Sequence, residues 1–428
     1  MTSLLNSNIQ INKTPTRVAG GPSVGWREAS LPGEEQSGQG FEGVSFVQYS
    51  SDFAKIVSEE ARHALLLSSA DSSRNAFFHR GCVHVIEPMA AGGGHGNDDT
   101  RNEGEVLYTV SNPLQAASSS QLPVVLISRI RLQRNGVGDI VAAEWAKLRP
   151  PSTMTMPAGA IPYSMPTRNG SKSTLGILYC AQGNGSPGTS GLFYMPRGKP
   201  PIPLITSYYG RDFHSVYDVA CHPRDGSLWF TDMCVGFEQE SRKQPRTPCL
   251  VYRFHPGTGD LRVVADGLNR PSGICFSVDA DTFYVTDTDS IESHGSSRGG
   301  GGAGSIFGGL GAGNDQDQDM QRATTIYAYD VLRRAGSDFL SKKRVFAYSL
   351  TGALMGIQCD AAGNVYAGCA DGVEVWDAGG VLLGVIKVPG SVTSFCFARN
   401  GEMFLCSNHQ LWWVDLKTEQ ERRRLEAC

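Results

Sequence analysis

Six residues stand at the same point of a repeated sequence pattern, so the fold would bring them together around one opening. They are Glu42, Gly159, Tyr217, Ser272, Met355 and Thr393. A carboxyl group in a partly apolar place has a raised pKa and can act as a general acid or base near neutral pH. A phenol and a hydroxyl can donate hydrogen bonds to a carbonyl oxygen that gains charge during a reaction. A thioether packs well on a ring or a hydrocarbon chain. The set therefore suits a hydrophobic small-molecule substrate.

We divide the candidate site residues by the role that each side chain could take. The predicted catalytic residues are Glu42, Tyr217 and Ser272. The predicted substrate-binding residues are Gly159, Gln182, His214, Met355 and Thr393. Two alternatives stay open, because Glu42 could be a structural residue bonded to backbone groups and Tyr217 could plug the opening. Gln182 and His214 would reach the site from loops, although a lone histidine is more often structural.

The elements that must position these residues are β-hairpins. The stretch 270–288, RPSGICFSVDADTFYVTDT, contains a short apolar strand, a polar turn and a second strand. The same pattern returns as YDVACHPRDGSLWFTD, MGIQCDAAGNVYAGC and TSFCFARNGEMFLC. Such turns between β-rich runs are a strong hairpin signal, and hairpins that recur at tens of residues indicate the blades of a propeller. Three aspartates at the ends of second strands are expected to stabilise turns: Asp232, Asp287 and Asp371.

The rest of the chain fits one all-β domain. Residues 1–39 are polar and are predicted to form a mobile arm, and 40–428 are predicted to form a single propeller domain. Glycine-rich inserts near 90–104 and 297–319 are expected to be surface loops. Four successive strands, FEGVSFVQY, ARHALLLSS, CVHVIEP and EVLYTVSN, are predicted to pair as one blade, and a further strand is expected within 139–148.

Composition excludes several classes of function. The 428 residues carry a net charge of −4, which gives no basic footprint for nucleic acid. No run approaches the ~20 apolar residues of a membrane span, and the first residues lack the apolar core of a secretory signal. The 11 cysteines form no CxxC pair, so we expect reduced thiols in a cytoplasmic protein. The expected oligomeric state is a monomer or a homodimer, without nucleic-acid or membrane partners.

Taken together, the motifs resemble the SMP-30/gluconolactonase/lactonohydrolase family, in particular its fungal branch. The matching stretches are FEG, LYCAQG, DVACHPRDGSLWFTD, ADGLNRPSGICFSVDADTFYVTDT and GIQCDAAGNVYAGCADGVEVWD. The resemblance implies a six-bladed β-propeller, with four-stranded antiparallel blades around a central channel and one ligand pocket at the channel mouth. In typical members that pocket holds a divalent cation, usually calcium, which polarises a lactone or similar ester for attack by water.

Of the four cation ligands that the resemblance implies, only one is retained. Glu42 stands at the glutamate of the first motif, whereas Tyr217 and Ser272 replace asparagines and Met355 replaces an aspartate. Calcium takes about 6–8 oxygen ligands, and a thioether suits it poorly. Asp218 is expected to face away from the channel, because consecutive strand residues point to opposite sides. We therefore expect no metal at this site and no cofactor, with weak or absent calcium binding.

A different chemistry is favoured if the usual cation is missing. Metal-poor relatives of this fold include fungal hetero-Diels–Alder enzymes, which join a tropolone quinone methide to a sesquiterpene alkene. The sequence predicts a metal-independent cyclase of fungal secondary metabolism, which dehydrates a precursor and then holds diene and alkene in reacting geometry. Two alternatives remain: a lactone hydrolase with a rebuilt divalent-cation site, and a non-catalytic propeller that binds a small molecule.

Overall fold

The structure, a computed structural model, describes most of the chain. The described residues are 11–13, 17–18, 27–28, 43–69, 75–88, 103–114, 124–136, 138–165, 174–238, 245, 247–288, 324–349 and 351–417. Glu42, the insert 297–319, and most of 1–39 and 90–104 lie outside them. Within the described part strands dominate, and the only α-helix is the single turn α1 (Val235–Glu238). No helix there is long and apolar enough to cross a membrane.

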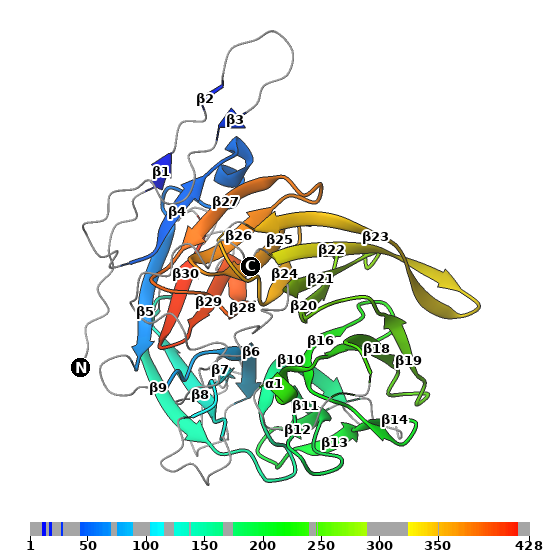
Figure 1. The fold of residues 1–428 in the computed structure, drawn as a ribbon. Coiled ribbons are helices and arrows are strands. Elements are labelled where there is room, and N and C mark those ends of the chain that lie inside the picture. The colour runs from blue at the N-terminus through cyan, green and yellow to red at the C-terminus, as the bar shows by residue number, and fades with distance from the viewer. Residues whose placement is uncertain are drawn as a thin grey trace, which may run out of the picture.

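Six sheets stand around one axis as the blades of a propeller (Figure 1). The innermost strands are β6 (Arg80–Pro88), β10 (Pro157–Met165), β16 (Val216–Cys221), β20 (Pro271–Phe276), β24 (Ile357–Cys359) and β28 (Ser394–Phe397). In the same blade order, the second strands are β7 (Glu103–Val110), β11 (Thr174–Ala181), β17 (Leu228–Asp232), β21 (Thr282–Thr288), β25 (Val365–Cys369) and β29 (Glu402–Ser407). The predicted all-β, six-bladed propeller is confirmed.

The outer part of each blade continues the antiparallel order. The third strands are β8 (Ile127–Arg134), β12 (Gly191–Pro196), β18 (Leu250–Phe254), β22 (Thr324–Arg334), β26 (Gly372–Trp376) and β30 (Gln410–Asp415). The fourth strands are β9 (Ile140–Leu148), β13 (Ile202–Ile205), β19 (Leu261–Ala265), β23 (Ser337–Ser349), β27 (Leu382–Lys387) and β5 (Arg62–Ser68). Minor elements are β2 (Arg17–Val18), β3 (Arg27–Glu28), β14 (Ser207–Tyr208), β15 (Arg211–Asp212), η1 (Ser51–Lys55) and η3 (Arg399–Gly401). The further strand expected within 139–148 is β9.

The ring closes through strands from the beginning of the chain. β5 pairs with β30 and completes the last blade, with Leu67 opposite Leu411. β4 (Ser45–Gln48) adds a fifth strand to the blade of β24–β27, and β1 (Ile11–Lys13) pairs parallel to β4. The prediction that the first four strands form one blade was therefore wrong, because they belong to three different sheets. Mixing early and late strands in one sheet removes the exposed edges that an open ring would leave.

Hydrophobic side chains fill the spaces between neighbouring blades. A typical contact joins the blade of β16–β19 to that of β20–β23, where Trp229, Phe276 and Phe283 meet. The Trp229 ring centroid lies 5.2 Å from that of Phe276 in an edge-to-face arrangement and 5.1 Å from that of Phe283. Such aromatic pairs add about 0.5–1.5 kcal/mol to the energy of burial. Packing between blades, in addition to pairing within them, thus holds the ring together.

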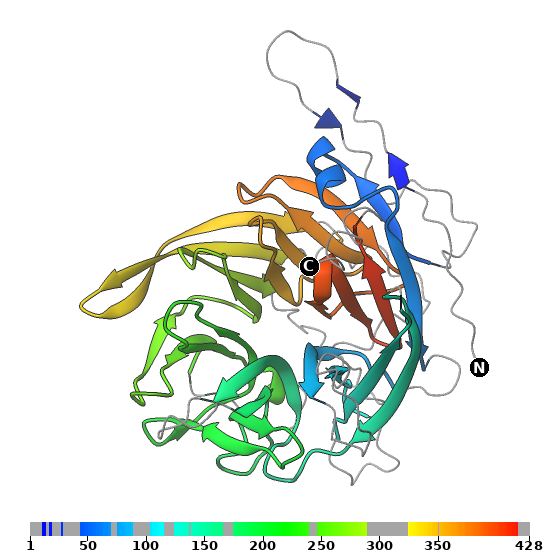
Figure 2. The same ribbon diagram turned by 180° about the vertical axis from the view of Figure 1, so that it is seen from behind.

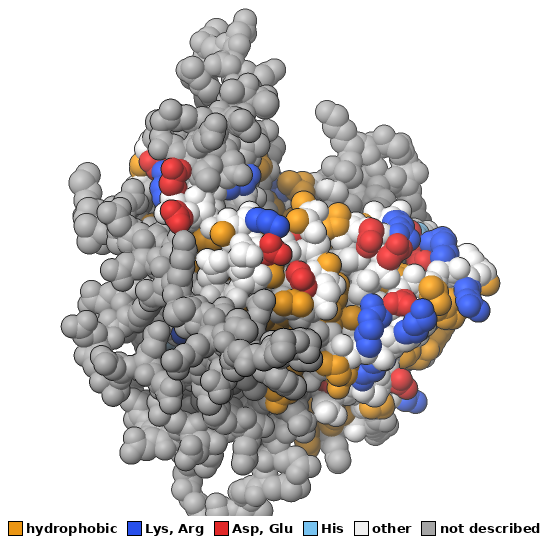
Figure 3. Space-filling model, turned by 90° about the horizontal axis from the view of Figure 1, so that it is seen from above, with side chains coloured by type: hydrophobic (Ala, Val, Ile, Leu, Met, Phe, Trp, Pro, Cys, Tyr) orange, Lys and Arg blue, Asp and Glu red, His pale blue; other side chains and the backbone are white. Residues whose placement is uncertain are grey.

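One hairpin extends beyond the ring. The long strands β22 and β23 reach outward from their blade, as both views of the ribbon show (Figures 1 and 2). In the view from above, Lys and Arg side chains lie on the side of the projecting end together with hydrophobic and acidic side chains (Figure 3). Val345 and Tyr348 on β23 are 65% and 53% exposed. The outer strand of this blade is therefore apolar as well as basic.

A buried ion network joins the closing blade to the next one. Arg134 on β8 donates hydrogen bonds to Glu105 on β7 at 2.5 and 2.8 Å, and to Glu402 on β29 at 2.7 and 2.6 Å. Burial favours the neutral form of Glu105, but the bonds from Arg134 and His84 outweigh it and lower its pKa to about 2. Stability from this carboxylate is therefore present above its unfolded pKa of about 4.5 and is lost as the pH falls toward 2.

We predict that Arg134→Met lowers the free energy of unfolding at pH 7 by about 3–5 kcal/mol, because two buried carboxylates lose their cation. Chemical denaturation measures this change. The control is Arg131→Met on the same strand, since Arg131 is 49% exposed and lies 3.8 Å from Glu144. It should change stability by less than about 1 kcal/mol. Equal effects of the two variants would contradict the assigned role of the network.

The inner strands converge so closely that two positions require glycine. A Cβ on Gly159 of β10 would lie 2.4 Å from Asp218 Oδ1 and 2.6 Å from the Tyr217 carbonyl oxygen of β16. A Cβ on Gly273 of β20 would lie 2.2 Å from the Met355 carbonyl oxygen. The gap that the sequence predicted at Gly159 is thus occupied by the backbone and carboxylate of the neighbouring blade.

We predict that Gly159→Ala lowers the free energy of unfolding by about 1–3 kcal/mol, the usual cost of inserting a methyl group into a closely packed place. Thermal and chemical denaturation measure it. Gly185→Ala is the matched control, because a Cβ there meets no atom within 4 Å, and it should stay within about 0.5 kcal/mol. A Gly159→Ala protein as stable as the control would refute the close approach of β10 and β16.

Candidate functional site

Aspartates of the second strands fix the segments that enter the inner strands. Asp232 at the end of β17 accepts a hydrogen bond from the Ser215 N–H at 2.7 Å. Asp287 on β21 accepts one from the Arg270 N–H at 2.6 Å. Because these carboxylates accept hydrogen bonds from backbone groups just before β16 and β20, their role is structural. They fix the backbone at the start of these two inner strands, and so they fix the positions of the side chains near the channel mouth.

Four of the inner strands begin with a β-bulge at the same point. The pairing register shifts between Arg80 and Val83 in β6, and at the equivalent places in β10, β16 and β20. A bulge interrupts the alternation of side chains and turns one of them to a new direction. The same type of bulge therefore changes the side-chain directions near the mouth in four blades.

Arg80 occupies the mouth beside two of the predicted site residues. Its guanidinium carbon lies 4.2 Å from the centroid of the Tyr217 ring, and its Nη2 lies 3.1 Å from Met355 Sδ. Arg80 is only 4% exposed. The structure thus brings Tyr217 and Met355 together around a buried cation that the sequence interpretation missed. The available signal was the HRGC run at the start of β6, which aligns with the start of the other inner strands.

A pocket opens beside the Arg80 guanidinium. Its empty volume, including space that is open to solvent, is ≈ 280 Å³, and its lining is His79, Arg80, Ser111, Asn112, Pro113, Val125, Pro157, Ala158, Gln182 and Tyr217. The lining thus combines apolar residues with residues that carry hydrogen-bonding groups. The pocket suits a ligand with a hydrocarbon part and one polar group directed at the guanidinium.

His79 lines this pocket as a neutral imidazole. Burial and the neighbouring Arg80 charge lower its pKa to about 3, although the bond to Asn408 opposes them. Nδ1 lies 2.7 Å from Asn408 Oδ1, so the neutral ring carries its proton on Nδ1. The Thr393 hydroxyl donates to the His79 carbonyl oxygen and fixes the backbone there. Thr393 therefore holds the backbone of a lining residue, and Arg80 is the charged residue of the lining.

Asp218 supplies a carboxyl group near the same cation. The sequence predicts a side chain that faces away from the channel, and this stays a prediction; Asp218 lies within the bulge of β16. Its Oδ2 accepts a hydrogen bond from the Ile274 N–H at 3.0 Å, so it lies between β16 and β20. Burial raises its pKa to about 6, although that bond and the Arg80 charge act in the opposite direction. Asp218 therefore changes charge within the range in which many enzymes work.

The other predicted site residues divide into two groups. Gln182 lines the pocket, and His214 is half-buried with its Nδ1 3.3 Å from the Thr247 hydroxyl. Ser272 is 2% exposed, and its hydroxyl bonds the Arg270 carbonyl oxygen at 3.1 Å and the Thr288 hydroxyl at 3.0 Å. Its oxygen is engaged within its own blade rather than beside Arg80. The catalytic role of Glu42 stays a prediction, because this residue lies outside the described ones.

The described residues of the mouth do not fit a calcium ion. The positions of the family's expected oxygen ligands hold a phenol ring and a thioether, with a guanidinium between them. A cation placed there would meet a fixed positive charge and a soft sulfur. The Arg80 guanidinium is itself the positive charge that a ligand would meet at the mouth.

The prediction of no metal cofactor requires a correction elsewhere in the molecule. His222, Asp225 and Asp338 form a group that could hold a metal ion, because their ligand atoms lie within 4.8 Å of one another. His222 Nδ1 lies 3.1 Å from Asp225 Oδ1. Sequence spacing missed this group, since Asp338 comes from the next blade. Arg253 shares it, with its Nη2 2.7 Å from Asp225 Oδ2.

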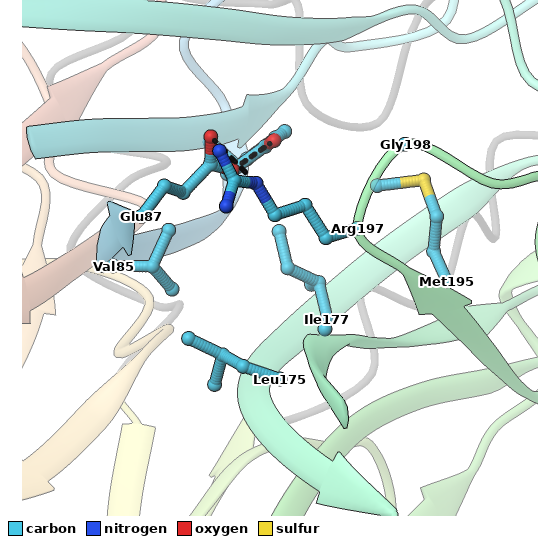
Figure 4. Close-up of a pocket in the computed structure, with 9 residues that line it drawn as sticks. Val85, Glu87, Leu175, Ile177, Met195, Arg197 and Gly198 are labelled. Atoms are coloured by element: carbon cyan, nitrogen blue, oxygen red, sulfur yellow. Dashed lines mark hydrogen bonds and ion pairs between the residues drawn. The ribbon is translucent and has the colours of Figure 1, made fainter. Parts of the chain in front are cut away.

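A second pocket lies between the blades of β6–β9 and β10–β13 (Figure 4). Its empty volume, including space that is open to solvent, is ≈ 320 Å³. Glu87 is its acid, and it accepts hydrogen bonds from the Tyr108 hydroxyl at 2.9 Å and from Arg129 at 2.7 Å. Arg197 lies 3.6 Å from the same carboxylate. Because Glu87 is already paired with cations, this pocket is an ion-pair site and lacks the uncommitted acid that catalysis requires.

Comparisons with known proteins agree with this geometry. Residues 191–293 match the SMP-30/Gluconolactonase/LRE-like region. The lactonohydrolase oryL of Aspergillus oryzae is 31% identical over 237 residues, which cover 52% of this chain and 50% of that protein. A gluconolactonase of Zymomonas mobilis is 25% identical over 223 residues, which cover 50% of this chain and 54% of that protein. The chain thus spans about half the length of the curated relatives that it matches.

Solved structures extend the likeness over the whole ring. A gluconolactonase from Xanthomonas campestris superposes with a TM-score of 0.55 at 19% identity, and the match covers 90% of this chain and 99% of that one. At this identity the likeness shows the fold alone. The match at 191–293 and the two relatives make the chain similar to the SMP-30/gluconolactonase-like family, and the six-bladed ring has the fold of the solved gluconolactonase.

Proposed function

We propose that the chain hydrolyses a lactone at the channel mouth, with the Arg80 guanidinium as the group that receives the carbonyl oxygen. The position of this buried guanidinium beside the pocket is the observation that carries the proposal. A lactone carbonyl oxygen becomes an oxyanion when water adds to the carbon, and fixed cationic donors stabilise it. The names of the relatives, a lactonohydrolase and a gluconolactonase, support the same reaction class.

The proton transfers are assigned to Asp218. Its carboxylate accepts a proton from the attacking water, whose oxygen bonds to the carbonyl carbon. The bond between that carbon and the ring oxygen then breaks, and the ring oxygen takes the proton back from Asp218. One lactone and one water give one hydroxy acid, and the carboxyl group is regenerated. A base with a pKa of about 6 suits this role near neutral pH.

The apolar residues of the pocket lining favour a lactone that carries a hydrocarbon group. Pro113, Val125 and Pro157 are among them. These residues are also the observation that supports the cyclase interpretation, which stays a prediction. Water labelled with ¹⁸O separates the two chemistries, because hydrolysis puts one labelled oxygen into each product carboxylate and cycloaddition incorporates none.

We predict that Arg80→Gln lowers kcat for lactone opening by about 10²–10³, because the oxyanion loses its charged donor. Acid release from a panel of alkyl and aldonic lactones measures the rate. Arg197→Gln is the matched control, since Arg197 lies in the second pocket and is 39% exposed. It should keep the wild-type rate. A wild-type protein that opens no lactone, or an Arg80→Gln protein with unchanged kcat, would exclude the mechanism.

We predict that kcat/KM rises with pH and levels off above about 6, because the Asp218 carboxyl must lose its proton. Asp218→Asn should remove the rise of kcat/KM with pH and lower its value at high pH by about 10²–10⁴. The amide oxygen of the variant can still accept the hydrogen bond from the Ile274 N–H. Since the folded pKa is above the ordinary 3.8, ionisation of Asp218 costs stability as the pH rises through 6. The variant should therefore be at least as stable as the wild type at pH 7.5. An unchanged pH profile would remove Asp218 from the reaction.

A further inference from the structure

Among the cysteines that the structure describes, three pairs of thiols have sulfur atoms within 3.6 Å of each other. Sγ atoms lie 3.4 Å apart in Cys82–Cys396, 3.6 Å apart in Cys275–Cys359 and 3.6 Å apart in Cys234–Cys249. The first two pairs join inner strands of neighbouring blades, β6 to β28 and β20 to β24. Their backbones are held by strand pairing and by the packing of the channel, so those sulfur atoms have little freedom to approach further.

The third pair differs because neither cysteine belongs to a strand. Cys234 lies between β17 and α1, and Cys249 immediately precedes β18. Cys234 is partly exposed, whereas Cys249 is buried. A disulfide has an S–S distance of about 2.05 Å, so the two sulfur atoms must approach by about 1.5 Å. Segments outside the strand ladders can make this movement, and the partly exposed thiol is within reach of a soluble oxidant.

We propose that Cys234 and Cys249 form a disulfide bond that fixes one wall of the channel mouth. With glutathione disulfide as oxidant, one cysteine thiolate attacks it, forms a mixed disulfide and releases one glutathione. The second cysteine thiolate then attacks the mixed disulfide and releases the second glutathione. Two protein thiols are oxidised, one glutathione disulfide is reduced, and the two thiol protons pass to the glutathione thiolates.

The bond would act on residues that position the site. Cys249 packs in one cluster with Ala158, Tyr217, Met233 and Val235. The Gly236 N–H, just after Cys234, donates to the Ser215 hydroxyl at 2.9 Å. Cys234 and Cys249 are 15 positions apart in the sequence, and a link of this length removes much of the freedom of the unfolded segment. The disulfide therefore tethers the segment that packs on Tyr217, and Tyr217 lies under the Arg80 guanidinium.

The environment of the pair sets the conditions for oxidation. The contact with Cys234 and burial raise the pKa of the Cys249 thiol well above its ordinary value. Because the thiolate is the reactive form, oxidation should be slow at pH 7 and faster as the pH rises. Cys221 is exposed and separate from the three pairs, so it reports the general reactivity of thiols in the same protein.

The test uses the full chain, purified with reductant and then treated with glutathione disulfide at pH 8.5. Remaining thiols are alkylated, and tryptic peptides are mapped by mass spectrometry without reduction. Trypsin cuts between the two cysteines at Arg242, Lys243 or Arg246, so a disulfide joins two otherwise separate peptides. We expect this linked species, together with a rise of a few degrees in the thermal midpoint that reductant reverses.

Variants separate this pair from the others. Cys234→Ala and Cys249→Ala should abolish the linked peptides and the thermal shift, whereas Cys275→Ala should keep both. If a variant fails to fold, the alkylation of each cysteine in wild-type protein before and after oxidation decides the question. Continued alkylation of Cys234 and Cys249 after Cys221 has fully reacted with glutathione, or linkage only through Cys82–Cys396 or Cys275–Cys359, would overturn the proposal. The readouts do not depend on lactone hydrolysis, so failure of the proposed function leaves this test intact.

Discussion

The close approach of the inner strands to one axis is the constraint on which the rest of the structure depends. At Gly159 and Gly273 the backbones of neighbouring blades leave no room for a Cβ. The few side chains that point to the axis are therefore placed by the ring as a whole. Arg80 is one of them, and its contacts with Tyr217 and Met355 come from two other blades. A cationic group is costly to bury, and its contact with the face of the Tyr217 ring offsets part of this cost.

The local part of the fold could be predicted from the sequence, and the non-local part could not. The hairpins of 270–288 and its repeats were predictable, because a polar turn between two β-rich runs determines its own pairing. The allocation of the first strands was not predictable from their order, since β5 pairs with β30 from the other end of the chain. The group of His222, Asp225 and Asp338 could not be predicted for the same reason, because Asp338 reaches it through packing between two blades.

The candidate site shows a similar division. Tyr217 and Met355 could be placed near the mouth by projecting the repeat, because equivalent positions of a repeat occupy equivalent places, whereas Gln182 was expected to reach it from a loop. Arg80 was not predicted as a site residue, because the predicted first blade began with the strand after Phe41 rather than with β6. The direction of Asp218 could not be derived from simple alternation, because this residue lies in the bulge between Val216 and Val219. Bulges leave no clear signal in a single sequence, and they decide which side chains reach the channel.

Ring closure by β5 has a consequence for how the protein acquires its structure. β5 comes before the innermost strands of all six blades in the chain, whereas its partner β30 follows every other strand of the ring. Until β30 is available, β5 carries an unpaired edge and the last blade lacks one strand. Contacts between distant parts of a chain form late and slowly. Completion of the ring therefore has to wait for β30, and the nascent chain has to keep an early strand available for this late partner.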